Sequence, residues 1–173
     1  KDVMPPQNRW LAVDGQPRDD TAAAVREAVT ETARYMLDPD TSPRELGFGT
    51  AGVPGIRALA ADLPEWHELA DPAWTARFAY QNIERRGTGG GAFRGLYAPF
   101  LDAWGDRVGL DGFDARMHAI ADDWTAVSEV LYDASETADL DDRRDLLADA
   151  SDRVAAIADA EERFYADVLD ALE

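Results

Sequence analysis

The sequence predicts an all-α fold: a helical bundle of about five to six helices, with an extended N-terminal arm and a long C-terminal antiparallel helical hairpin. Three observations predict this fold. Apolar residues recur every three to four positions along most of the chain, strand-like alternation is missing after residue 14, and Asp-Pro or glycine-rich breaks separate the periodic stretches. We divide the chain into an extended arm over 1–19, linking it to a missing upstream domain, and a single α-helical domain over 20–173.

The first stretch of the chain has no helical period. Residues 1–19 contain MPPQNRWLAVDGQP, and a residue that precedes proline prefers an extended backbone. We therefore expect an extended arm that Trp10 and Leu11 anchor to the domain. Asp20 is a favourable N-cap for a first helix, which we predict over 20–37 because an Asp-Pro pair follows it.

Two short elements come next. Prolines and glycines are frequent over 38–53, which we predict to be a loop. A short helix is expected over 54–63, and Pro64 then opens a turn that ends at Leu69.

The helix predicted over 72–86 has clear boundaries, because an Asp-Pro pair begins it and a glycine follows its last residue. Its apolar residues fall on two sides, with Trp74 and Phe78 on one and Tyr80 and Ile83 on the other. A helix that is apolar on opposite faces is usually buried. We therefore predict that this is the central helix.

The following helix is expected to begin near Ala92 and to carry one dense apolar stripe. Pro99 lies inside it, and its ring would clash with the carbonyl of Gly95, so we expect a kink there. The stripe comprises Phe93, Leu96, Tyr97, Phe100, Leu101, Trp104 and Val108.

Two long helices close the sequence, over 113–137 and 141–172. Apolar residues repeat by four and then three in each, which is the seam of packed helices, and a short turn joins the two. We therefore predict an antiparallel hairpin. The first seam comprises Phe113, Met117, Ile120, Trp124, Val127 and Leu131. The second comprises Leu147, Ala150, Val154, Ile157, Glu161, Phe164 and Val168.

The net charge of −18 limits the partners. Nucleic acid and anionic membranes both require Lys and Arg against phosphate, so we expect no nucleic acid and no membrane as a partner. The acid is mostly aspartate, and Lys1 is the only lysine among 17 basic residues. Such acidic surfaces resemble those of proteins from salt-loving archaea, where molar salt shortens the Debye length to about 3 Å and screens self-repulsion. We expect a cytoplasmic protein of such a halophilic archaeon; a docking surface for a cationic partner is the alternative interpretation.

Cysteine is absent from the sequence, which excludes disulfides, cysteine-ligated metals and a cysteine nucleophile within this chain. No apolar run approaches the roughly 18 residues that a membrane span needs. We expect no catalytic residue, no metal site and no cofactor in this chain.

The glycine-rich stretch RRGTGGGAFRG, residues 85–95, is the first candidate for chemistry. It matches neither the phosphate-loop nor the dinucleotide-loop pattern, and a helix rather than a strand precedes it. Free amides at a helix N-terminus with arginines nearby attract a carboxylate or a phosphate. A tight turn between closely packed helices would instead use the glycines only for positive φ. The candidate ligand-binding residues are Arg86, Gly87, Thr88, Gly89, Gly90, Gly91 and Arg94.

Two further groups raise the possibility of chemistry. One helix face carries three residues that could act as metal ligands, Asp114, His118 and Asp122. The Glu-x-x-His pairs that are typical of metal sites in helical bundles are missing from the sequence. We therefore expect these three residues at the solvent edge of the bundle. Glu161 interrupts an apolar seam, either as a buried general base or, as we favour, as a residue that fixes register or pairs with an arginine. The five tryptophans are expected in the core rather than in a ligand box: Trp10, Trp66, Trp74, Trp104 and Trp124.

Several segments, in order, resemble a known family. They are PPQNRW near the start, ETARYML at the end of the first helix, GIRALAADLPEW and, above all, IERRGTGGGAFRGLYAPFL. Together they resemble a helical domain of unknown function that follows the N-terminal domain of proteins related to butirosin biosynthesis protein H. The resemblance spans residues 5–110 and is strongest over 83–101.

This resemblance implies a two-domain protein. The N-terminal part of the family resembles papain-like or C39-peptidase-like cysteine enzymes, and in the butirosin member it moves an aminoacyl group from a carrier protein to an aminoglycoside amine. The nucleophilic cysteine belongs to that part, so no catalytic residue carries over to this chain. The resemblance implies that the chain alone is non-catalytic and that the full-length protein is an acyltransferase-like enzyme. Its implied partner is the upstream domain, with an acyl carrier protein or amine acceptor reached through that domain.

We therefore carry three hypotheses. The first is a non-catalytic domain that shapes or covers the substrate or carrier site of the upstream domain, with the glycine-rich stretch facing the cleft between them. The alternative is a free-standing helical protein-interaction module with no enzymatic role, docking through the surface over 113–172, which an exposed apolar patch there would favour. The third is an enzyme that uses Arg94 and an acid such as Glu84 on an anionic metabolite.

Overall fold

The computed structural model describes residues 20–39 and 50–173; the predicted arm and most of the predicted 38–53 loop lie outside these ranges. The described residues form six α-helices and no strand, which confirms the all-α prediction. The α-helices are α1 (Thr21–Leu37), α2 (Gly52–Asp62), α3 (Pro72–Tyr80), α4 (Arg94–Val108), α5 (Phe113–Glu136) and α6 (Leu140–Leu172). Three short elements connect them: the 3-10 helices η2 (Leu63–Glu68) and η4 (Gly91–Phe93) and the π-helix η3 (Gln81–Arg85).

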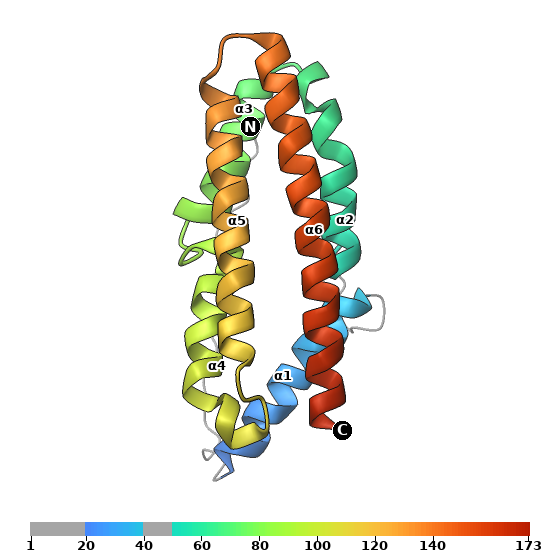
Figure 1. Ribbon diagram of the computed structural model, residues 1–173, viewed down its shortest axis with the longest axis vertical. Helices are drawn as coiled ribbons and strands as arrows, with labels where there is room; N and C mark the ends of the chain where they lie inside the picture. Colours follow the sequence, from blue (N-terminus) through green and yellow to red (C-terminus); the bar gives the residue numbers. More distant parts are fainter. Residues whose placement is uncertain (1–19, 40–49) are drawn as a thin grey trace, which may run out of the picture.

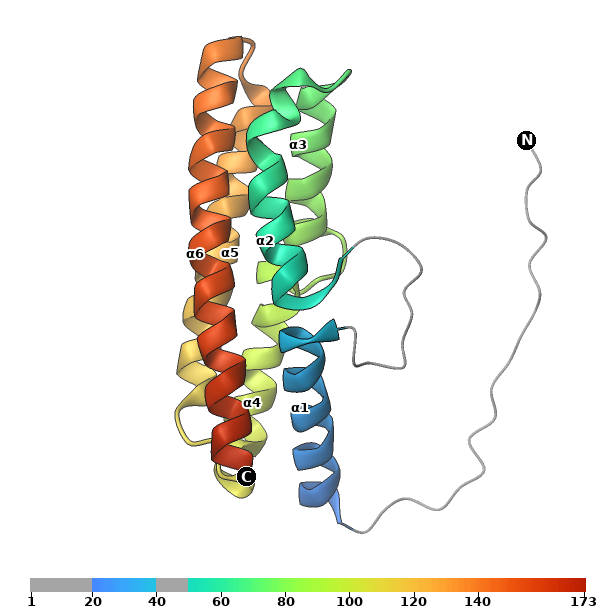
Figure 2. The ribbon, with the colours of Figure 1, turned by 90° about the vertical axis from the view of Figure 1, so that its right-hand side faces the viewer.

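The helices form an elongated bundle in which two long helices carry four shorter ones (Figure 1). The helix α5 packs along both α3 and α4, and α6 packs along both α1 and α2. Figure 2 shows α3 above α4 and α2 above α1, and each of these short pairs runs antiparallel to the long helix beside it. The chain therefore passes from α3 to α4 at mid-height of the bundle, through the glycine-rich stretch.

The long helices α5 and α6 supply most of the core, as the heptad pattern predicts. They run antiparallel and pack against each other along their length (Figure 1). Every predicted seam residue is buried except Phe113, which is partly buried. Beyond the predicted seams, Ala134 and Tyr165 are also buried.

Capping residues set the predicted helix starts. The Asp20 carboxylate accepts a hydrogen bond from the Ala23 amide at 2.9 Å, and the Asp71 carboxylate accepts one from the Trp74 amide at 3.0 Å. The predictions that the first and third main helices begin after these two acids are confirmed. The short helix α2 begins at Gly52 rather than at residue 54.

The prediction that the helix over 72–86 is central is wrong. The α-helix ends at Tyr80 and continues as the π-helical turn η3, and within α3 only Ala76 is buried. Trp74 is 56% exposed and Phe78 is 46% exposed. One apolar side packs on α5 while the other faces outward, so α5 and α6 are the central helices.

The apolar stripe predicted for the next helix is correct only in its later part. The helix α4 begins at Arg94 rather than at Ala92, and Phe93 and Leu96 are 59% and 56% exposed. Pro99 lies within the helix as predicted. The prediction that the tryptophans lie in the core is only partly correct. Trp124 is buried, and Trp66 and Trp104 are partly buried. Trp74 is exposed, against our prediction, and Trp10 lies outside the described ranges.

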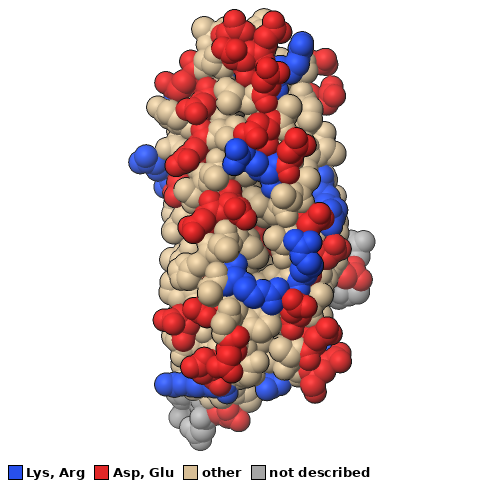
Figure 3. All heavy atoms as spheres, in the orientation of Figure 1, with Lys and Arg blue, Asp and Glu red and all other residues tan. Residues whose placement is uncertain are grey.

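Acidic side chains cover much of the surface. On the face that α5 and α6 form, Asp and Glu are spread over its whole length, and arginines gather near mid-height (Figure 3). Among the described residues, none of the helices has the length and apolarity that crossing a bilayer requires.

Candidate functional site

The glycine-rich stretch forms a strained corner between η3 and α4; we call residues 86–94 the glycine corner. Its backbone is left-handed at four glycines, and also at Ala92, with φ of 50°, and at Phe93, with φ of 73°. A left-handed conformation costs an L-residue roughly 1–2 kcal/mol. The corner therefore needs contacts elsewhere that hold it in place. The glycines are Gly87, Gly89, Gly90 and Gly91.

Close packing against α5 provides the first of these contacts. A Cβ atom on Gly91 would lie 2.7 Å from the carbonyl oxygen of Ala121 and 2.8 Å from its Cα. Only glycine allows the corner to approach α5 this closely. A Cβ on Gly95 would similarly lie 2.7 Å from the carbonyl oxygen of Gly89. The missing side chain at Gly95 thus lets the first turn of α4 fold back onto the corner.

An ion pair from α6 provides the second contact. Arg94 donates from Nε to Oε1 of Glu161 at 2.9 Å and from Nη2 to Oε2 at 2.7 Å. Its third nitrogen, Nη1, donates to the carbonyl oxygen of Ala92 at 2.7 Å. The guanidinium therefore joins α6 directly to the left-handed turn. We favoured a Glu161 that fixes register or pairs with an arginine over a general base, and the pairing with an arginine is confirmed.

The environment favours the charged form of Arg94. The Glu161 side chain is fully buried, and Trp124 donates its indole N–H to Oε1 at 2.9 Å. Burial would lower the pKa of Arg94, but the charge and hydrogen bonds of Glu161 outweigh burial and raise that pKa above its ordinary value. The guanidinium also lies 5.6 Å from the centre of the Trp124 ring, a favourable cation–π distance.

A second carboxylate lies under the corner. Glu84 accepts a hydrogen bond from the Gly91 amide at 3.2 Å and one from the Thr125 hydroxyl at 3.1 Å. Two donors that could bind an external anion, the Arg94 guanidinium and the Gly91 amide, are therefore occupied by carboxylates of the chain itself. The hypothesis of an enzyme acting on an anionic metabolite used Arg94 and Glu84. In the structure, both side chains are occupied by these contacts within the chain.

The other predicted ligand-binding residues lie in the same corner but differ in exposure. Arg86 is exposed and donates to the side-chain oxygen of Gln81 at 2.7 Å. Thr88 is buried, and its hydroxyl donates to the carbonyl oxygen of Ile83 at 2.8 Å. Gly87 is also exposed. Ligand binding at the corner stays a prediction.

We did not identify two tyrosines as neighbours of the ion pair from the sequence, although Tyr97 lies in the predicted apolar stripe. Tyr165 is 4% exposed, and the Tyr97 hydroxyl is buried without a hydrogen-bond partner among the described residues. Burial raises the pKa of Tyr97 to about 12 and also raises the pKa of Tyr165. Tyr97 follows Arg94 by three positions and Tyr165 follows Glu161 by four, so helical spacing was a signal that could have placed both beside the pair.

The candidate metal ligands all lie on α5. His118 and Asp122 are exposed and Asp114 is half-buried. Within the described ranges, no group of three or more metal-ligating side chains has the geometry to hold a metal ion.

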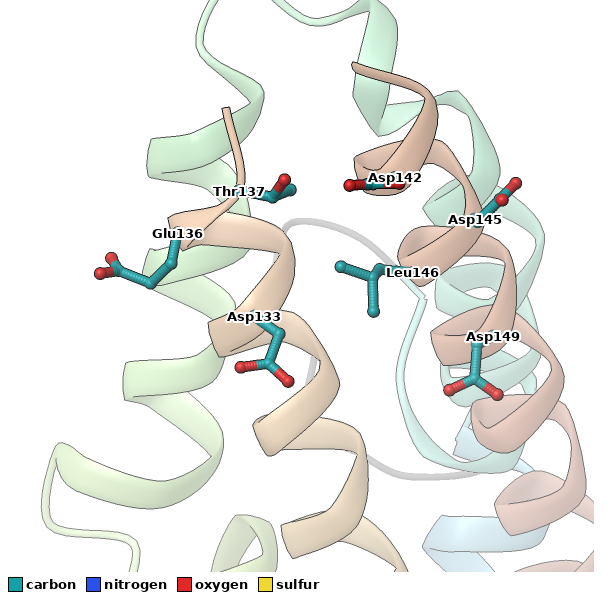
Figure 4. A pocket seen from close by; sticks show the side chains of 7 residues that line it. All are labelled: Asp133, Glu136, Thr137, Asp142, Asp145, Leu146 and Asp149. Carbon is teal, nitrogen blue, oxygen red and sulfur yellow. The ribbon is translucent and has the colours of Figure 1, made fainter. Parts of the chain in front are cut away.

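A pocket of about 600 Å³ lies near the turn between α5 and α6, and Figure 4 shows side chains of the two helices on either side of it. Five of its seven lining residues are acidic. On a chain with a net charge of −18, acidic linings are expected, so the pocket supports no assignment. The lining residues are Asp133, Glu136, Thr137, Asp142, Asp145, Leu146 and Asp149.

The fold and the corner define an all-α bundle domain whose glycine corner is fixed by a buried ion pair. A family model described as a domain of unknown function, DUF4872, matches residues 1–168. The chain therefore belongs to this family. No curated protein and no solved structure matches it significantly.

Proposed function

We propose that this domain is the non-catalytic C-terminal helical part of a butirosin-H-like protein. In this proposal it packs against an upstream cysteine acyltransferase- or peptidase-like domain of the same polypeptide and shapes or covers the substrate or carrier site there. One observation carries the proposal: four large apolar side chains are exposed on the two sides of the glycine corner. They are Trp74, Phe78, Phe93 and Leu96, each between 46% and 59% exposed.

Three of these side chains have contacts with one another or with the corner. The Trp74 and Phe78 rings are 6.3 Å apart. The Arg86 guanidinium lies 4.9 Å from the centre of the Phe78 ring, and Gly89 lies directly against the Leu96 side chain. A large exposed apolar patch on a monomer usually marks an interaction site. The patch supports a contact between domains at this corner.

The strain in the corner supports the same proposal. Left-handed backbone at non-glycine residues tends to cluster at functional sites, where the surrounding structure holds it. Here the ion pair and the packing of Gly91 on Ala121 hold Ala92 and Phe93. The exposed Phe93 ring is therefore presented from a fixed backbone, which reduces the entropy cost of docking.

The alternative, a free-standing interaction module, would have its partner on another chain. We expected it to dock through the hairpin surface over 113–172. Among the described residues, the exposed large apolar side chains of that hairpin are Tyr132 and Leu140. Four large apolar side chains are exposed in and around the glycine corner, against two on the hairpin, and for that reason we place the docking surface at the corner.

We also propose that the acidic surface is an adaptation to high salt in a cytoplasmic protein of a halophilic archaeon. Its support is the net charge of −18, the use of arginine in place of lysine and the acid that covers the face in Figure 3. Screening by molar salt makes such a surface tolerable.

The first experiment is to sequence the gene upstream of the codon for Lys1. A coding region for a cysteine-containing domain is expected there, and its absence would overturn the proposal. The second is hydrogen exchange on the full-length protein. The amides over 85–96 are expected to exchange more slowly than in the isolated 1–173 chain, and equal rates would show that the upstream domain does not cover the corner.

A further inference from the structure

The segment 72–101, which contains the glycine corner, carries the opposite charge to the rest of the chain. Residues 72–101 contain four arginines and one acid, a net charge of +3, which leaves −21 for the remaining residues. We infer that the corner binds an acidic protein surface, one that presents apolar side chains surrounded by Asp and Glu. This inference rests on the proposed function for the location of the docking surface, and it adds the chemistry of the partner.

The single acid of this segment does not face the partner. Glu84 is turned inward, where it accepts from the Gly91 amide and the Thr125 hydroxyl. Of the four arginines, Arg94 is neutralised by Glu161 and Arg77 pairs with Glu136. Within this segment, the charge that remains at the surface is therefore that of the two exposed arginines, Arg85 and Arg86.

These two arginines have neutral partners. Arg85 donates to the Tyr80 hydroxyl at 2.8 Å, and Arg86 donates to the amide oxygen of Gln81 at 2.7 Å. No ion pair joins either of them to a carboxylate in the part of the chain that the structure describes. Other arginines in the same part do pair with acids: Arg57, Arg77, Arg94, Arg116, Arg144 and Arg153.

Both guanidinium groups lie over aromatic rings, Arg86 over Phe78 at 4.9 Å and Arg85 over Tyr80 at 5.9 Å. The rings orient the guanidinium planes while leaving N–H donors for a carboxylate. Arginine binds carboxylates in a bidentate geometry that this arrangement permits.

We define the corner patch as Trp74, Phe78, Arg85, Arg86, Phe93 and Leu96. Its composition is that of a protein interface, because interface cores are enriched in aromatic residues and arginine and depleted in Asp and Glu. The corner also projects from the side of the bundle beside α5, where a partner can reach it (Figure 1).

A protein fits the corner patch better than a nucleic acid does. The phosphate backbone of a nucleic acid would extend past the patch onto the rest of the chain, whose net charge is −21, and would be repelled there. A folded protein can place a few carboxylates at the contact and keep the rest of its charge away. Apolar contacts with Trp74 and Phe93 would then hold the complex when salt screens the ion pairs.

Fluorescence anisotropy tests this inference on the intact chain, at the lowest salt that preserves its helical circular dichroism. The probe is a labelled peptide in which Asp alternates with Leu. It is expected to bind the wild-type chain, although net charge alone predicts repulsion. The double variant Arg85→Glu/Arg86→Glu is expected to bind at least about tenfold more weakly, because two charge-assisted contacts are lost.

The matched control is Arg144→Glu/Arg153→Glu, which makes the same change in net charge at two arginines whose side chains are 58% and 48% exposed. It is expected to bind like the wild type. If the glutamate pair at the corner disturbs folding, Arg85→Gln/Arg86→Gln replaces it, with the same expected loss. Absence of peptide binding, or equal loss in both double variants, would overturn the inference. Stronger binding of a labelled single-stranded oligonucleotide than of the peptide would also overturn it.

Hydrogen exchange on the full-length protein separates this inference from the proposed function. If the upstream domain protects the corner and Arg85→Glu/Arg86→Glu leaves that protection unchanged, the acidic-partner inference is wrong and the proposed function stands. If the peptide binds as expected and the corner has no protection from an upstream domain, the inference stands and the proposed function is wrong.

Discussion

Arg94 at the start of α4 forms a bidentate ion pair with Glu161 in α6, with Nη2 and Oε2 2.7 Å apart and the glutamate side chain fully buried. The same guanidinium holds the carbonyl oxygen of Ala92 in the left-handed turn. A contact between residues 67 positions apart therefore fixes the conformation of the glycine corner. The corner in turn fixes the backbone that presents the exposed Phe93 ring.

Replacing Glu161 with glutamine is expected to destabilise the domain strongly. The substitution leaves the Arg94 guanidinium largely buried without its counter-charge, and breaking a buried pair in this way costs about 3–5 kcal/mol. The free energy of unfolding, measured by urea titration and circular dichroism, checks this value.

The neighbouring Glu162→Gln variant is the control, because Glu162 pairs with Arg57 at an exposed site. An exposed pair contributes little to stability because solvent and salt screen it. Comparable losses in Glu161→Gln and Glu162→Gln would contradict the structural role of the buried pair. The double variant Arg94→Met/Glu161→Leu is expected to recover much of the loss, since it removes both charges together.

Gly91→Ala is expected to destabilise the domain more than Gly87→Ala. Both residues have positive φ, but a Cβ on Gly91 would collide with the Ala121 backbone, whereas a Cβ on Gly87 would meet nothing within 4 Å. We expect a loss of about 1–2 kcal/mol at Gly87 from the backbone alone and about 2–5 kcal/mol at Gly91. Urea unfolding of both variants measures the difference, and equal losses would contradict the close packing of the corner on α5.

Gly89 and Gly90 lie between Gly87 and Gly91, and replacing either with alanine is expected to cause an intermediate loss of stability. A Cβ on Gly89 would meet the Leu96 side chain, which is exposed and has room to move. A Cβ on Gly90 would lie 3.3 Å from a carboxylate oxygen of Glu84. The Gly89→Ala/Gly90→Ala variant is therefore expected to lose stability mainly through its two positive φ angles, by about 2–4 kcal/mol in urea unfolding. No loss of stability would contradict the turn conformation.

The sequence predicted the parts of this fold that depend on local chemistry. N-cap aspartates begin α1 and α3, and the heptad seams of α5 and α6 are buried where their spacing places them. These features are predictable because caps and periodicity act within a few residues of the chain. The same local rule failed for Trp74 and Phe78, because an apolar side of a helix does not reveal whether another element covers it.

The candidate site depended on contacts that are distant in sequence. An acid in an apolar seam predicted that Glu161 has a positively charged partner, and the structure identifies Arg94. The spacing of residues within one helix could not identify it, because Arg94 lies in another helix. The left-handed backbone of Ala92 and Phe93 was also unpredictable, since neither residue type favours positive φ. Tertiary contacts impose that conformation.

Removing salt is expected to destabilise the domain if its acidic surface is an adaptation to salt. With a net charge of −18, self-repulsion grows as the Debye length lengthens from about 3 Å in molar salt to about 10 Å at 0.1 M. Thermal unfolding by circular dichroism across this range of KCl is expected to show a Tm that rises with salt. A Tm that does not change between these limits would contradict the adaptation.

The buried hydroxyl of Tyr97 gives the last prediction. Because this hydroxyl has no hydrogen-bond partner among the described residues, Tyr97→Phe is expected to raise the free energy of unfolding at neutral pH by about 1 kcal/mol. The ordinary pKa of tyrosine is 10.0, and burial raises the pKa of Tyr97 to about 12 in the folded domain. Between these values the unfolded chain binds fewer protons, so stability falls as the pH rises from 10.0 towards 12. Urea unfolding above and below pH 10.0 is expected to show a shallower fall in Tyr97→Phe than in the wild type.

The half-exposed Tyr132 supplies the control for this measurement. It packs against Tyr80 at the outer edge of α5, and its Tyr132→Phe variant is expected to keep the alkaline loss of stability that the wild type shows. A destabilised Tyr97→Phe at neutral pH would contradict the prediction and would indicate that the hydroxyl has a partner outside the described residues. Equal alkaline slopes in the wild type and Tyr97→Phe would show that this tyrosine does not control stability above its ordinary pKa.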